Sequence, residues 1–338
     1  MASTLKAGVD PVTGEVQETP ELRTAGLQQL RAAIAADQAK APGWRSVRED
    51  DSFLLAFLRA RKFEVPRVLP VVRSFSQFWY ANPTLINGLC AEKVRRVYGL
   101  GFLRQLDTKD AQGNALCLLD ISKVDYSQFT DFEQTQLSLY IMLHCFGDEE
   151  FQRKGLTIVE DFAGFSVIRM VSVTKKLKEP GQEQLMAFGM DTLPMRIRAI
   201  YVVRQPMWFS AFWGAVKWFF KKKLRDRLVL CGKDLAALHQ SVPPASLPPQ
   251  YGGTLDEAPG AWLEKRAAEE AATDMAGGFA LPLRLDDPTG ERRRAEAASG
   301  GGGGGGPATV QPLAGGSSGG ALHLPPQEET AGEAFGIE

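Results

Sequence analysis

Residues 208–227 read WFSAFWGAVKWFFKKKLRDR and combine aromatic and basic side chains at high density. The first thirteen residues include seven aromatic side chains, and five of the next seven residues are Lys or Arg. Aromatic rings favour the headgroup level of a bilayer, and each nearby Lys or Arg contributes about 1 kcal/mol of attraction to anionic lipid. The chemistry that this segment predicts is therefore non-covalent binding of apolar groups next to anions.

Positive charge is concentrated in one part of the chain. The formal net charge of the 338 residues is −1, but residues 194–227 carry nine basic side chains and one acid. That segment has a formal charge of +8, which leaves −9 for the remainder. A neutral chain with one basic patch indicates a local anionic partner and does not suggest a nucleic-acid-binding protein.

The aromatic side chains would share one face if residues 208–220 form a helix. Six of the seven fall within an arc of about 140°, and Trp218 stands apart beside alanines. An ordinary amphipathic helix packed on a sheet would show such an arc. The small residues and the lone Trp on the opposite side favour a helix that covers a ligand or faces a membrane. Both interpretations stay open.

The side chains that could catalyse a reaction do not form a catalytic pattern. Outside the tail rich in Gly and Ser, the chain lacks GxGxxG and GxSxG motifs, and it has no GxxxxGK[ST] motif anywhere. Its histidines, His144, His239 and His323, are isolated, and we expect His144 to pack in a core or a pocket. Glu160 and Asp161 end a predicted strand, where ligands bind in α/β folds, although capping of the next turn explains them equally well. We predict no enzyme, no metal site and no cofactor.

Cysteine usage and hydropathy indicate the compartment. The four cysteines form no CxxC pair, which is typical of reduced thiols and offers no metal-ligand spacing. The first residues lack the apolar core of a secretory signal, and no stretch approaches the ~20 apolar residues that span a bilayer. We expect a cytoplasmic protein that contacts membranes only at their surface.

The predicted elements are helices in the first part of the chain and alternating strands and helices after it. Apolar residues recur at helical spacing in residues 21–38, 50–63 and 67–83. Short apolar runs then alternate with helical stretches, and runs that are apolar on both faces indicate a covered, largely parallel sheet. The predicted strands are 101–107, 115–121, 155–161, 198–204 and 227–231, and the predicted helices are 131–146, 166–191 and 207–224. The fold class expected is α/β.

Composition sets the domain boundaries that we expect. One more helix is predicted at 261–276, and a run of seven glycines follows in a tail rich in Gly, Ser and Pro. The predicted organisation is a disordered tail (1–20), a helical domain (21–95), an α/β domain (96–257) and a mostly disordered Gly-rich tail (258–338).

Four passages resemble the CRAL-TRIO family of lipid-binding proteins, in its branch with alpha-tocopherol transfer protein, cellular retinaldehyde-binding protein and the clavesins. They are DDSFLLAFLRARKF (50–63), EDFAGF (160–165), MDTLPMRIRAIYVVRQP (190–206) and KKLRDRLVLCGKDLAALHQSVPPASLPPQYGG (222–253). The resemblance covers roughly residues 20–257. It implies a helical domain and an α/β domain whose sheet floors a hydrophobic pocket under a mobile lid near residues 204–224.

The resemblance also implies roles for apolar side chains. The pocket-lining residues that we expect are Tyr140, Leu143, Ile158, Phe162, Ile168, Phe188, Phe209, Phe212 and Val216. For each of them, ordinary core packing stays an equal alternative. The side chains expected on the lid or facing the membrane are Trp208, Trp213, Trp218, Phe219 and Phe220.

Phosphoinositide contacts are implied in the same way. In the tocopherol-transfer branch, two basic residues before a strand and two after the lid make these contacts. They correspond to Arg196, Arg198, Lys223 and Arg227, and Lys221 and Lys222 extend the run. Arg and Lys are the side chains that recognise phosphate. A further contact of that branch would fall at Pro70, which is not basic.

The predicted function is intracellular binding and transfer of a small lipophilic ligand, tocopherol- or retinoid-like, with phosphoinositide-dependent docking on endosomal or other intracellular membranes. The alternative is a phosphoinositide-binding trafficking adaptor of the clavesin type. Phospholipid exchange would need polar pocket groups for a headgroup, and no such set is identified. The partners expected are the lipophilic molecule and the membrane, with no nucleic acid, for a monomeric protein.

Overall fold

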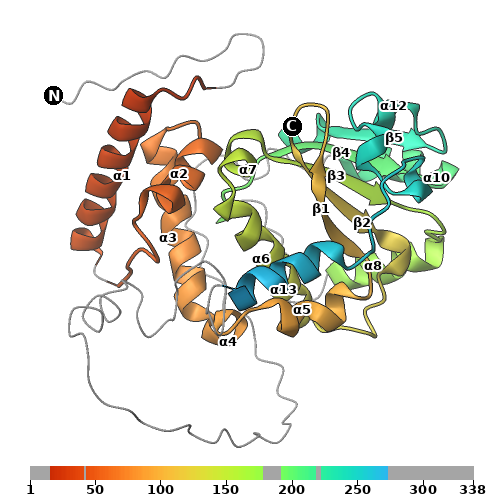
Figure 1. Ribbon diagram of the computed structural model, residues 1–338, viewed down its shortest axis with the longest axis horizontal. Coiled ribbons are helices and arrows are strands. Elements are labelled where there is room, and N and C mark those ends of the chain that lie inside the picture. The colour runs from red at the N-terminus through yellow and green to blue at the C-terminus, as the bar shows by residue number, and fades with distance from the viewer. Residues whose placement is uncertain (1–15, 42, 178–191, 218–221, 273–338) are drawn as a thin grey trace, which may run out of the picture.

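A group of N-terminal helices lies beside a five-stranded sheet that has helices of its own (Figure 1). The structure, a computed structural model, describes residues 16–41, 43–177, 192–217 and 222–272. The N-terminal helices are α1 (Pro20–Lys40), α2 (Asp51–Ala60), α3 (Val65–Ala81), α4 (Pro83–Ile86) and α5 (Ala91–Tyr98). The helical pattern expected for this part of the chain is confirmed.

Local sequence signals set the starts of these helices. The Thr19 hydroxyl accepts a hydrogen bond from the Leu22 amide at 3.2 Å, and the Asp50 carboxylate accepts one from the Phe53 amide at 3.2 Å. Both side chains therefore satisfy amides that have no partner within the helix. Pro66 occupies the first turn of α3, where its missing N–H group carries no penalty.

The sheet is mixed and largely parallel, as predicted. Its strands lie in the order β1 (Leu103–Lys109), β2 (Ala115–Asp120), β3 (Leu156–Asp161), β4 (Ile197–Val203) and β5 (Leu228–Gly232). Among the described strands, β1 and β2 pair in antiparallel fashion, and the other neighbours are parallel. β3 is the central strand. In this register Glu160 lies between Leu119 of β2 and Val202 of β4.

Helices follow the strands and cover the sheet. They are α6 (Asp131–Gly147), α7 (Glu149–Lys154), α8 (Val167–Leu177), α10 (Met207–Val216), α11 (Lys222–Arg225) and α12 (Ala236–His239). Short 3-10 turns span Ile121–Lys123, Pro244–Ser246 and Pro249–Tyr251. A capping box between Thr130 and Glu133 starts α6. The predicted helices 166–191 and 207–224 extend partly into 178–191 and 218–221, outside the described residues.

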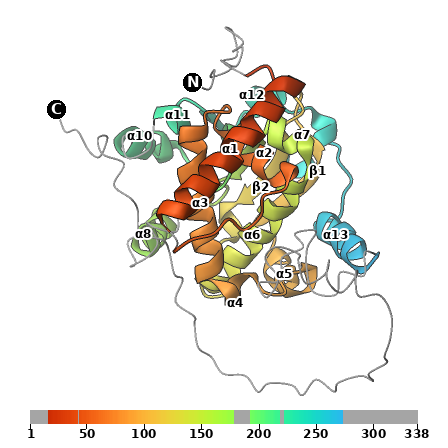
Figure 2. The ribbon, with the colours of Figure 1, turned by 90° about the vertical axis from the view of Figure 1, so that its left-hand side faces the viewer.

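α13 (Ala261–Ala272) returns from the end of the sheet domain to the N-terminal half of the chain. It packs against α5 and β1, and Figure 2 shows it on the side of the molecule opposite to α8 and α10. Trp262 stacks on Tyr98, with ring centroids 6.1 Å apart. The rest of the C-terminal segment predicted to be disordered, residues 273–338, lies outside the described residues, as do residues 1–15.

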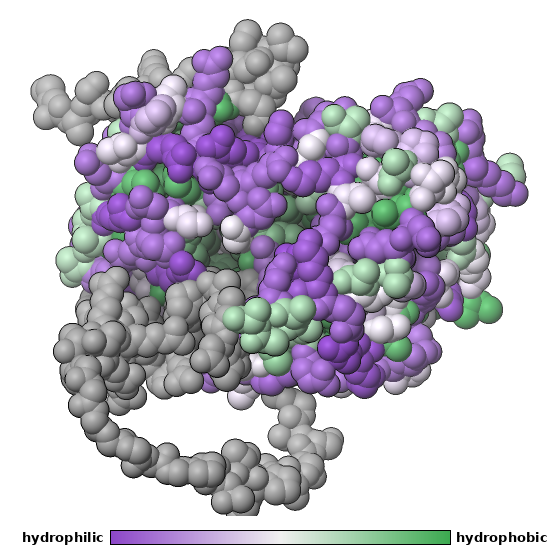
Figure 3. All heavy atoms as spheres, in the orientation of Figure 1, coloured by the Kyte–Doolittle hydropathy of each residue, from purple (hydrophilic) through white to green (hydrophobic). Residues whose placement is uncertain are grey.

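The surface seen in the orientation of Figure 1 is mostly hydrophilic (Figure 3). Within the described ranges, no helix combines the length and the apolar composition that a membrane span requires.

Candidate functional site

One face of the sheet is incompletely covered. Ile158 and Glu160 of the central strand keep intermediate exposure, as does Leu119 of the adjacent β2. On the opposite face, Leu118 and Val159 are 2% and 0% exposed. Interior strands are normally closely packed on both faces. Partial exposure in the middle of the sheet therefore indicates open space above this face.

Two apolar clusters surround that space and meet at Ile158. The larger cluster joins α6 to the N-terminal helices and includes Cys117 of β2. The smaller one consists of Phe162, Phe165, Ile200, Val202 and Phe209. Ile158 packs against both clusters. The floor is thus apolar and lies between α6 and α10, which form two walls.

The aromatic side chains of α10 point towards the sheet. The Phe209 ring lies 4.7 Å from the Phe162 ring between centroids, and the Phe212 ring lies 5.8 Å from that of Phe209. Trp208 stacks on Phe165 at 6.0 Å. The small residues of the helix, Ser210, Ala211 and Gly214, are exposed. The described members of the predicted aromatic arc, Trp208, Phe209, Phe212 and Trp213, therefore pack on the cluster above the sheet in this conformation.

The other predicted pocket residues are distributed differently. Tyr140 is fully buried, and its hydroxyl donates a hydrogen bond to Glu270 of α13 at 2.7 Å. Ile168 is 82% exposed, because it lies on the outer side of α8, and the structure does not bring it to this space. Phe188, Trp218, Phe219 and Phe220 lie outside the described residues, as does the side chain of Val216.

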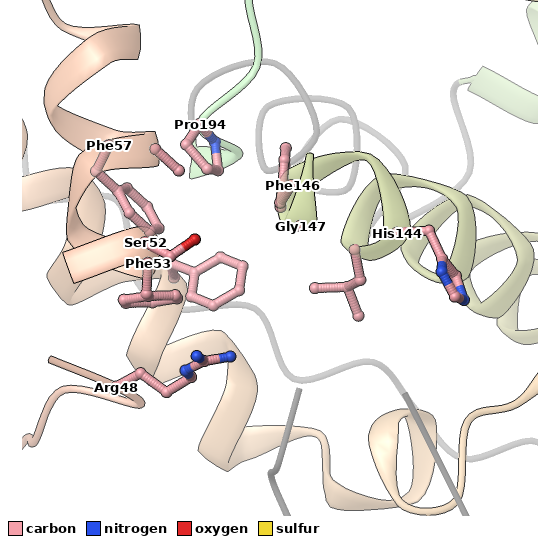
Figure 4. Close-up of a pocket in the computed structure, with 11 residues that line it drawn as sticks. Arg48, Ser52, Phe53, Phe57, His144, Phe146, Gly147 and Pro194 are labelled. Atoms are coloured by element: carbon pink, nitrogen blue, oxygen red, sulfur yellow. The ribbon is translucent and has the colours of Figure 1, made fainter. Parts of the chain in front are cut away.

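A cavity of about 90 Å³ lies between the N-terminal helices and α6 (Figure 4). Phe53 and Phe57 of α2 line one side, and Leu143 and Phe146 of α6 line the other. Leu143, a predicted pocket residue, is therefore placed here. The aromatic residues of α2 were missed by sequence reasoning because their helical spacing predicts core packing only.

Glu160 and Asp161, the two acids at the end of β3, have opposite environments. Asp161 is buried and receives hydrogen bonds from Arg204 Nε at 3.0 Å and from the Ala163 amide at 2.9 Å. It caps the turn after the strand. Glu160 is partly exposed on the incompletely covered face, and the apolar surroundings remove enough water from its carboxyl to raise the pKa of that group to about 7. No described group donates a hydrogen bond to this carboxyl.

Basic side chains gather where β3 and β4 begin. The guanidinium groups of Arg196 and Arg198 donate hydrogen bonds to the Arg153 carbonyl at 3.0 and 3.1 Å. Arg227 donates to the Ile197 carbonyl. The C-terminal end of α7, where carbonyls attract cations, therefore orients two of the predicted phosphate contacts. Lys222 pairs with Asp226 at 2.7 Å; Lys221 and the Lys223 side chain lie outside the described residues.

This grouping adds two basic residues that sequence reasoning missed, Arg153 and Lys154. They precede the strand predicted at 155–161, just as Arg196 and Arg198 stand at the start of the strand predicted at 198–204. Parallel pairing brings the starts of neighbouring strands to one edge of a sheet. The position of basic pairs directly before two predicted parallel strands is the sequence signal that could have identified Arg153 and Lys154.

The histidines and acids offer no catalytic arrangement among the described residues. Burial, reinforced by Arg266, lowers the pKa of His144 to about 3, although the Glu270 carboxylate lies 3.6 Å from its Nε2. His239 Nε2 lies 2.8 Å from the Tyr251 carbonyl oxygen. Within the described part of the chain, no group of three His, Cys, Asp or Glu side chains could hold a metal ion.

Comparisons with known proteins show what this chain is similar to. The CRAL/TRIO domain family matches residues 100–253. Alpha-tocopherol transfer protein-like of Homo sapiens is 30% identical over 243 residues, which are 72% of this chain and 69% of that protein. Clavesin-1 of Mus musculus is 31% identical over 261 residues, 74% of this chain and 71% of that protein. The crystal structure of Sfh5 covers 74% of this chain and 92% of that chain, with 17% identity and a TM-score of 0.48.

Proposed function

This chain belongs to the CRAL/TRIO domain family, and on that premise we propose that it binds a small lipophilic molecule and transfers it at phosphoinositide-bearing membranes. The partial exposure of Leu119 and Ile158 in the middle of the sheet supports the proposal most directly. Apolar side chains that border open space inside a fold gain stability when an apolar ligand fills it, by about 25 cal/mol per Å² of buried surface.

The α10 helix would act as the cover of this space. Its rings contact Phe162 and Phe165, which follow the central strand. Among the described residues, the contacts that hold these rings are apolar side-chain packing in the smaller cluster. If α10 moves outward, Trp208, Phe209 and Phe212 become exposed together. Aromatic side chains favour the bilayer interface, so contact with a membrane would offset the exposure and stabilise the open form.

An exposed apolar patch supports docking at a membrane surface. Val167, Ile168 and Val171 of α8 are exposed, as is Met207 at the start of α10. α8 and α10 both pack on the smaller apolar cluster and lie on the same side of the molecule (Figure 2). Contact there would place the cover next to the lipid phase.

The basic cluster would supply the phosphoinositide preference. Arg196, Arg198 and Arg227 are proposed to bind the headgroup phosphates, with Lys221, Lys222 and Lys223 extending the site. Backbone carbonyls orient Arg196 and Arg198 before any ligand arrives, which reduces the entropy lost on binding.

The name of the first relative, which refers to alpha-tocopherol transfer, supports a tocopherol-like cargo for this chain. A retinoid-like cargo rests on the resemblance of the sequence passages alone. We propose that the protein is a monomeric, non-enzymatic carrier, located in the cytoplasm, that acts on endosomal or other intracellular membranes. The likeness to clavesin-1 keeps a trafficking adaptor as the second candidate.

Native mass spectrometry of the purified full chain, followed by extraction and identification of any bound molecule, tests the proposal. A carrier should retain one lipophilic molecule per chain, and it should release that molecule to acceptor vesicles faster when they contain phosphatidylinositol bisphosphate. A protein that stays empty in lipid mixtures, but still binds those vesicles, would support the adaptor instead.

A further inference from the structure

The turn between β4 and α10 contains a residue in an unusual backbone conformation. Arg204 has a φ of 54°, in the left-handed region that side chains with a Cβ atom disfavour. Within the described part of the chain, the other non-glycine residues with a positive φ are Lys62 and Phe63. They follow α2, where a left-handed residue is a common helix end. Arg204 instead follows a strand, and its conformation sets the direction in which the chain leaves the sheet.

The side chain of Arg204 holds the residue in this conformation. Its guanidinium donates two hydrogen bonds to Asp161 at the end of the adjacent β3, one from Nε to Oδ1 at 3.0 Å and one from Nη2 to Oδ2. The guanidinium also lies 5.5 Å from the centroid of the Tyr251 ring. Strained conformations persist only where the surroundings hold them, and a two-point ion pair with a fully buried carboxylate fixes both position and angle.

The backbone is anchored on the strand side of this turn. The Arg204 amide donates a hydrogen bond to the Gly232 carbonyl at 2.6 Å, and the Gly232 amide donates one to the Gln205 side chain at 3.0 Å. Pro206 then begins α10 without a side-chain cap. Rotation about the N–Cα bond of Arg204 would leave its amide in place and move the guanidinium, Gln205 and α10 together. Relaxation of this one φ angle therefore separates the ion pair and displaces the helix in a single motion.

We propose that the Arg204–Asp161 pair is a hinge latch, which keeps α10 on the sheet and limits the rate of ligand exchange. While the pair is intact, Arg204 stays left-handed and α10 stays closed. When the pair separates, Arg204 relaxes to a negative φ and α10 swings outward. The inference rests on the proposed function, in which α10 covers the ligand space. Hinges are typically a few residues at element ends that absorb a large change in φ or ψ.

The neighbouring helix α8 is tied down separately and can stay in place during this motion. Arg169 Nη1 donates a hydrogen bond to the Ile121 carbonyl at 3.2 Å, and Lys176 pairs with Asp131 at 2.9 Å. Both contacts join α8 to the segment between β2 and α6. The smaller apolar cluster would therefore divide between α8 and α10, with α10 as the part that moves.

Two substitutions of one residue separate backbone strain from loss of the ion pair. Arg204→Ala and Arg204→Asn both remove the guanidinium, but Asn tolerates the left-handed region and Ala does not. The left-handed penalty corresponds to about a five- to thirtyfold shift in an equilibrium. We therefore expect α10 to open at least about fivefold more often in Arg204→Ala than in Arg204→Asn, with the wild type opening least.

Hydrogen exchange of the full-length protein, followed by mass spectrometry, measures this opening without any ligand. Amides of α10 report the latch, and amides of α6 report global unfolding. Arg45→Ala, which removes an exposed guanidinium over the Tyr80 ring, is the control and should leave α10 unchanged. Melting temperatures show that each variant is folded. If Arg204→Ala does not fold, Arg204→Gln replaces it, because Gln also disfavours a positive φ.

A second measurement connects the latch to the ligand. The protein is loaded with alpha-tocopherol and, in a parallel sample, with retinol, and release to phosphatidylcholine vesicles is followed. Release should become faster in the same order as α10 exchange, with Arg204→Ala fastest and the wild type slowest.

The outcomes distinguish the latch from the carrier function. Equal α10 exchange in Arg204→Ala and Arg204→Asn, an equal increase in α6, or release rates that do not follow α10 exchange would each overturn the latch while the carrier function stands. A wild-type protein that takes up neither probe, nor any lipid from a cell extract, overturns the carrier function; the exchange ratio of the two variants then still decides whether Arg204 controls α10.

Discussion

Two adjacent carboxyl groups in β3 show how much depends on a single residue's position in a strand. Asp161 faces the layer formed by α12 and the 3-10 turns, where Arg204 and the Ala163 amide neutralise it. Glu160 faces the opposite side, where apolar residues dominate. Successive side chains of a strand alternate between its faces. For this reason the carboxylate of Asp161 has hydrogen-bond donors, whereas the carboxyl of the adjacent Glu160 has none among the described residues.

Replacing Asp161 by Asn should destabilise the protein by about 1–2 kcal/mol, because it weakens the hydrogen bonds to a buried carboxylate, while Arg204, whose side chain is 35% exposed, stays accessible to water. Urea unfolding monitored by tryptophan fluorescence would measure the change. The matched control is Asp226→Asn, which removes an exposed pair with Lys222 and should change the free energy of unfolding by less than about 0.5 kcal/mol. Equal effects of the two substitutions would contradict the structural role of Asp161.

The stability of the ligand-free protein should decrease between about pH 4.5 and pH 7 because of Glu160. Its carboxyl pKa is raised from 4.5 to about 7 in the folded state, so the folded protein binds this proton more tightly than the unfolded chain. The contribution is present below pH 4.5 and is lost as the pH rises through 7, with a total of up to about 3 kcal/mol.

The buried imidazole of His144 has the opposite effect below its unfolded pKa of 6.5, since its folded pKa is lowered to about 3. Stability profiles of the wild type and of Glu160→Gln should therefore be subtracted, which removes the contribution of His144. A difference that stays constant from pH 4.5 to 8 would be inconsistent with a buried, titrating Glu160.

At the scale of elements, α13 is held by polar contacts that connect distant parts of the chain. The two carboxylate oxygens of Glu270 accept hydrogen bonds from the Tyr140 hydroxyl at 2.7 Å and from the Ala91 amide at 3.0 Å. One side chain thus joins α13 to α6 and to the start of α5. Trp262 fills the apolar side of the same contact.

Glu270→Ala should destabilise the protein by about 2–3 kcal/mol, because it leaves a buried hydroxyl and a helix-end amide without partners. It should also increase hydrogen exchange in α13 before global unfolding, which mass spectrometry would detect. Glu269→Ala is the control on the same helix, since its carboxylate is half exposed and pairs with Arg266 at 3.2 Å near the surface. Unchanged exchange in the Glu270 variant would show that α13 is held by its apolar contacts alone.

At the scale of the whole molecule, charge and apolar exposure divide the surface. α8, α10 and α11 lie on one side, and α13 lies on the other (Figure 2). The exposed apolar residues of α8 and Met207 belong to the first side. A net charge of −1 would not attract the protein to anionic lipid by itself, so orientation must come from local charge.

The double substitution Arg198→Gln and Arg227→Gln should weaken binding to vesicles containing phosphatidylinositol bisphosphate by about tenfold or more, at about 1 kcal/mol for each cation. Vesicle co-sedimentation at 0.15 M salt would measure it. Lys265→Gln, which removes an exposed cation of α13 on the opposite side, should have little effect. If both variants lose affinity equally, the attraction is a matter of total charge rather than of this cluster.

Local sequence patterns were sufficient to predict most of the described strands and helices and to indicate the family. Apolar runs at 115–121, 155–161 and 198–204 correspond to β2, β3 and β4 within one residue at each end, because interior parallel strands are buried on both faces. Helix starts were readable where Thr19 and Asp50 cap them. The signature passages around these elements resemble those of the CRAL/TRIO family closely enough to indicate it.

Which face of the sheet is incompletely covered, and which side chains lie on that face, follows only from the packing of the folded chain. Strands that are apolar on both sides carry no sign of which side packs less closely, so Glu160 and Asp161 could not be distinguished by sequence. Ile168 fits a pocket by composition, yet the outward side of α8 exposes it. Arg153 joins Arg196 and Arg198 through the register of β3 and β4, and the contact of Glu270 with Tyr140 spans 130 residues. Such contacts depend on packing between distant segments, which local patterns do not encode.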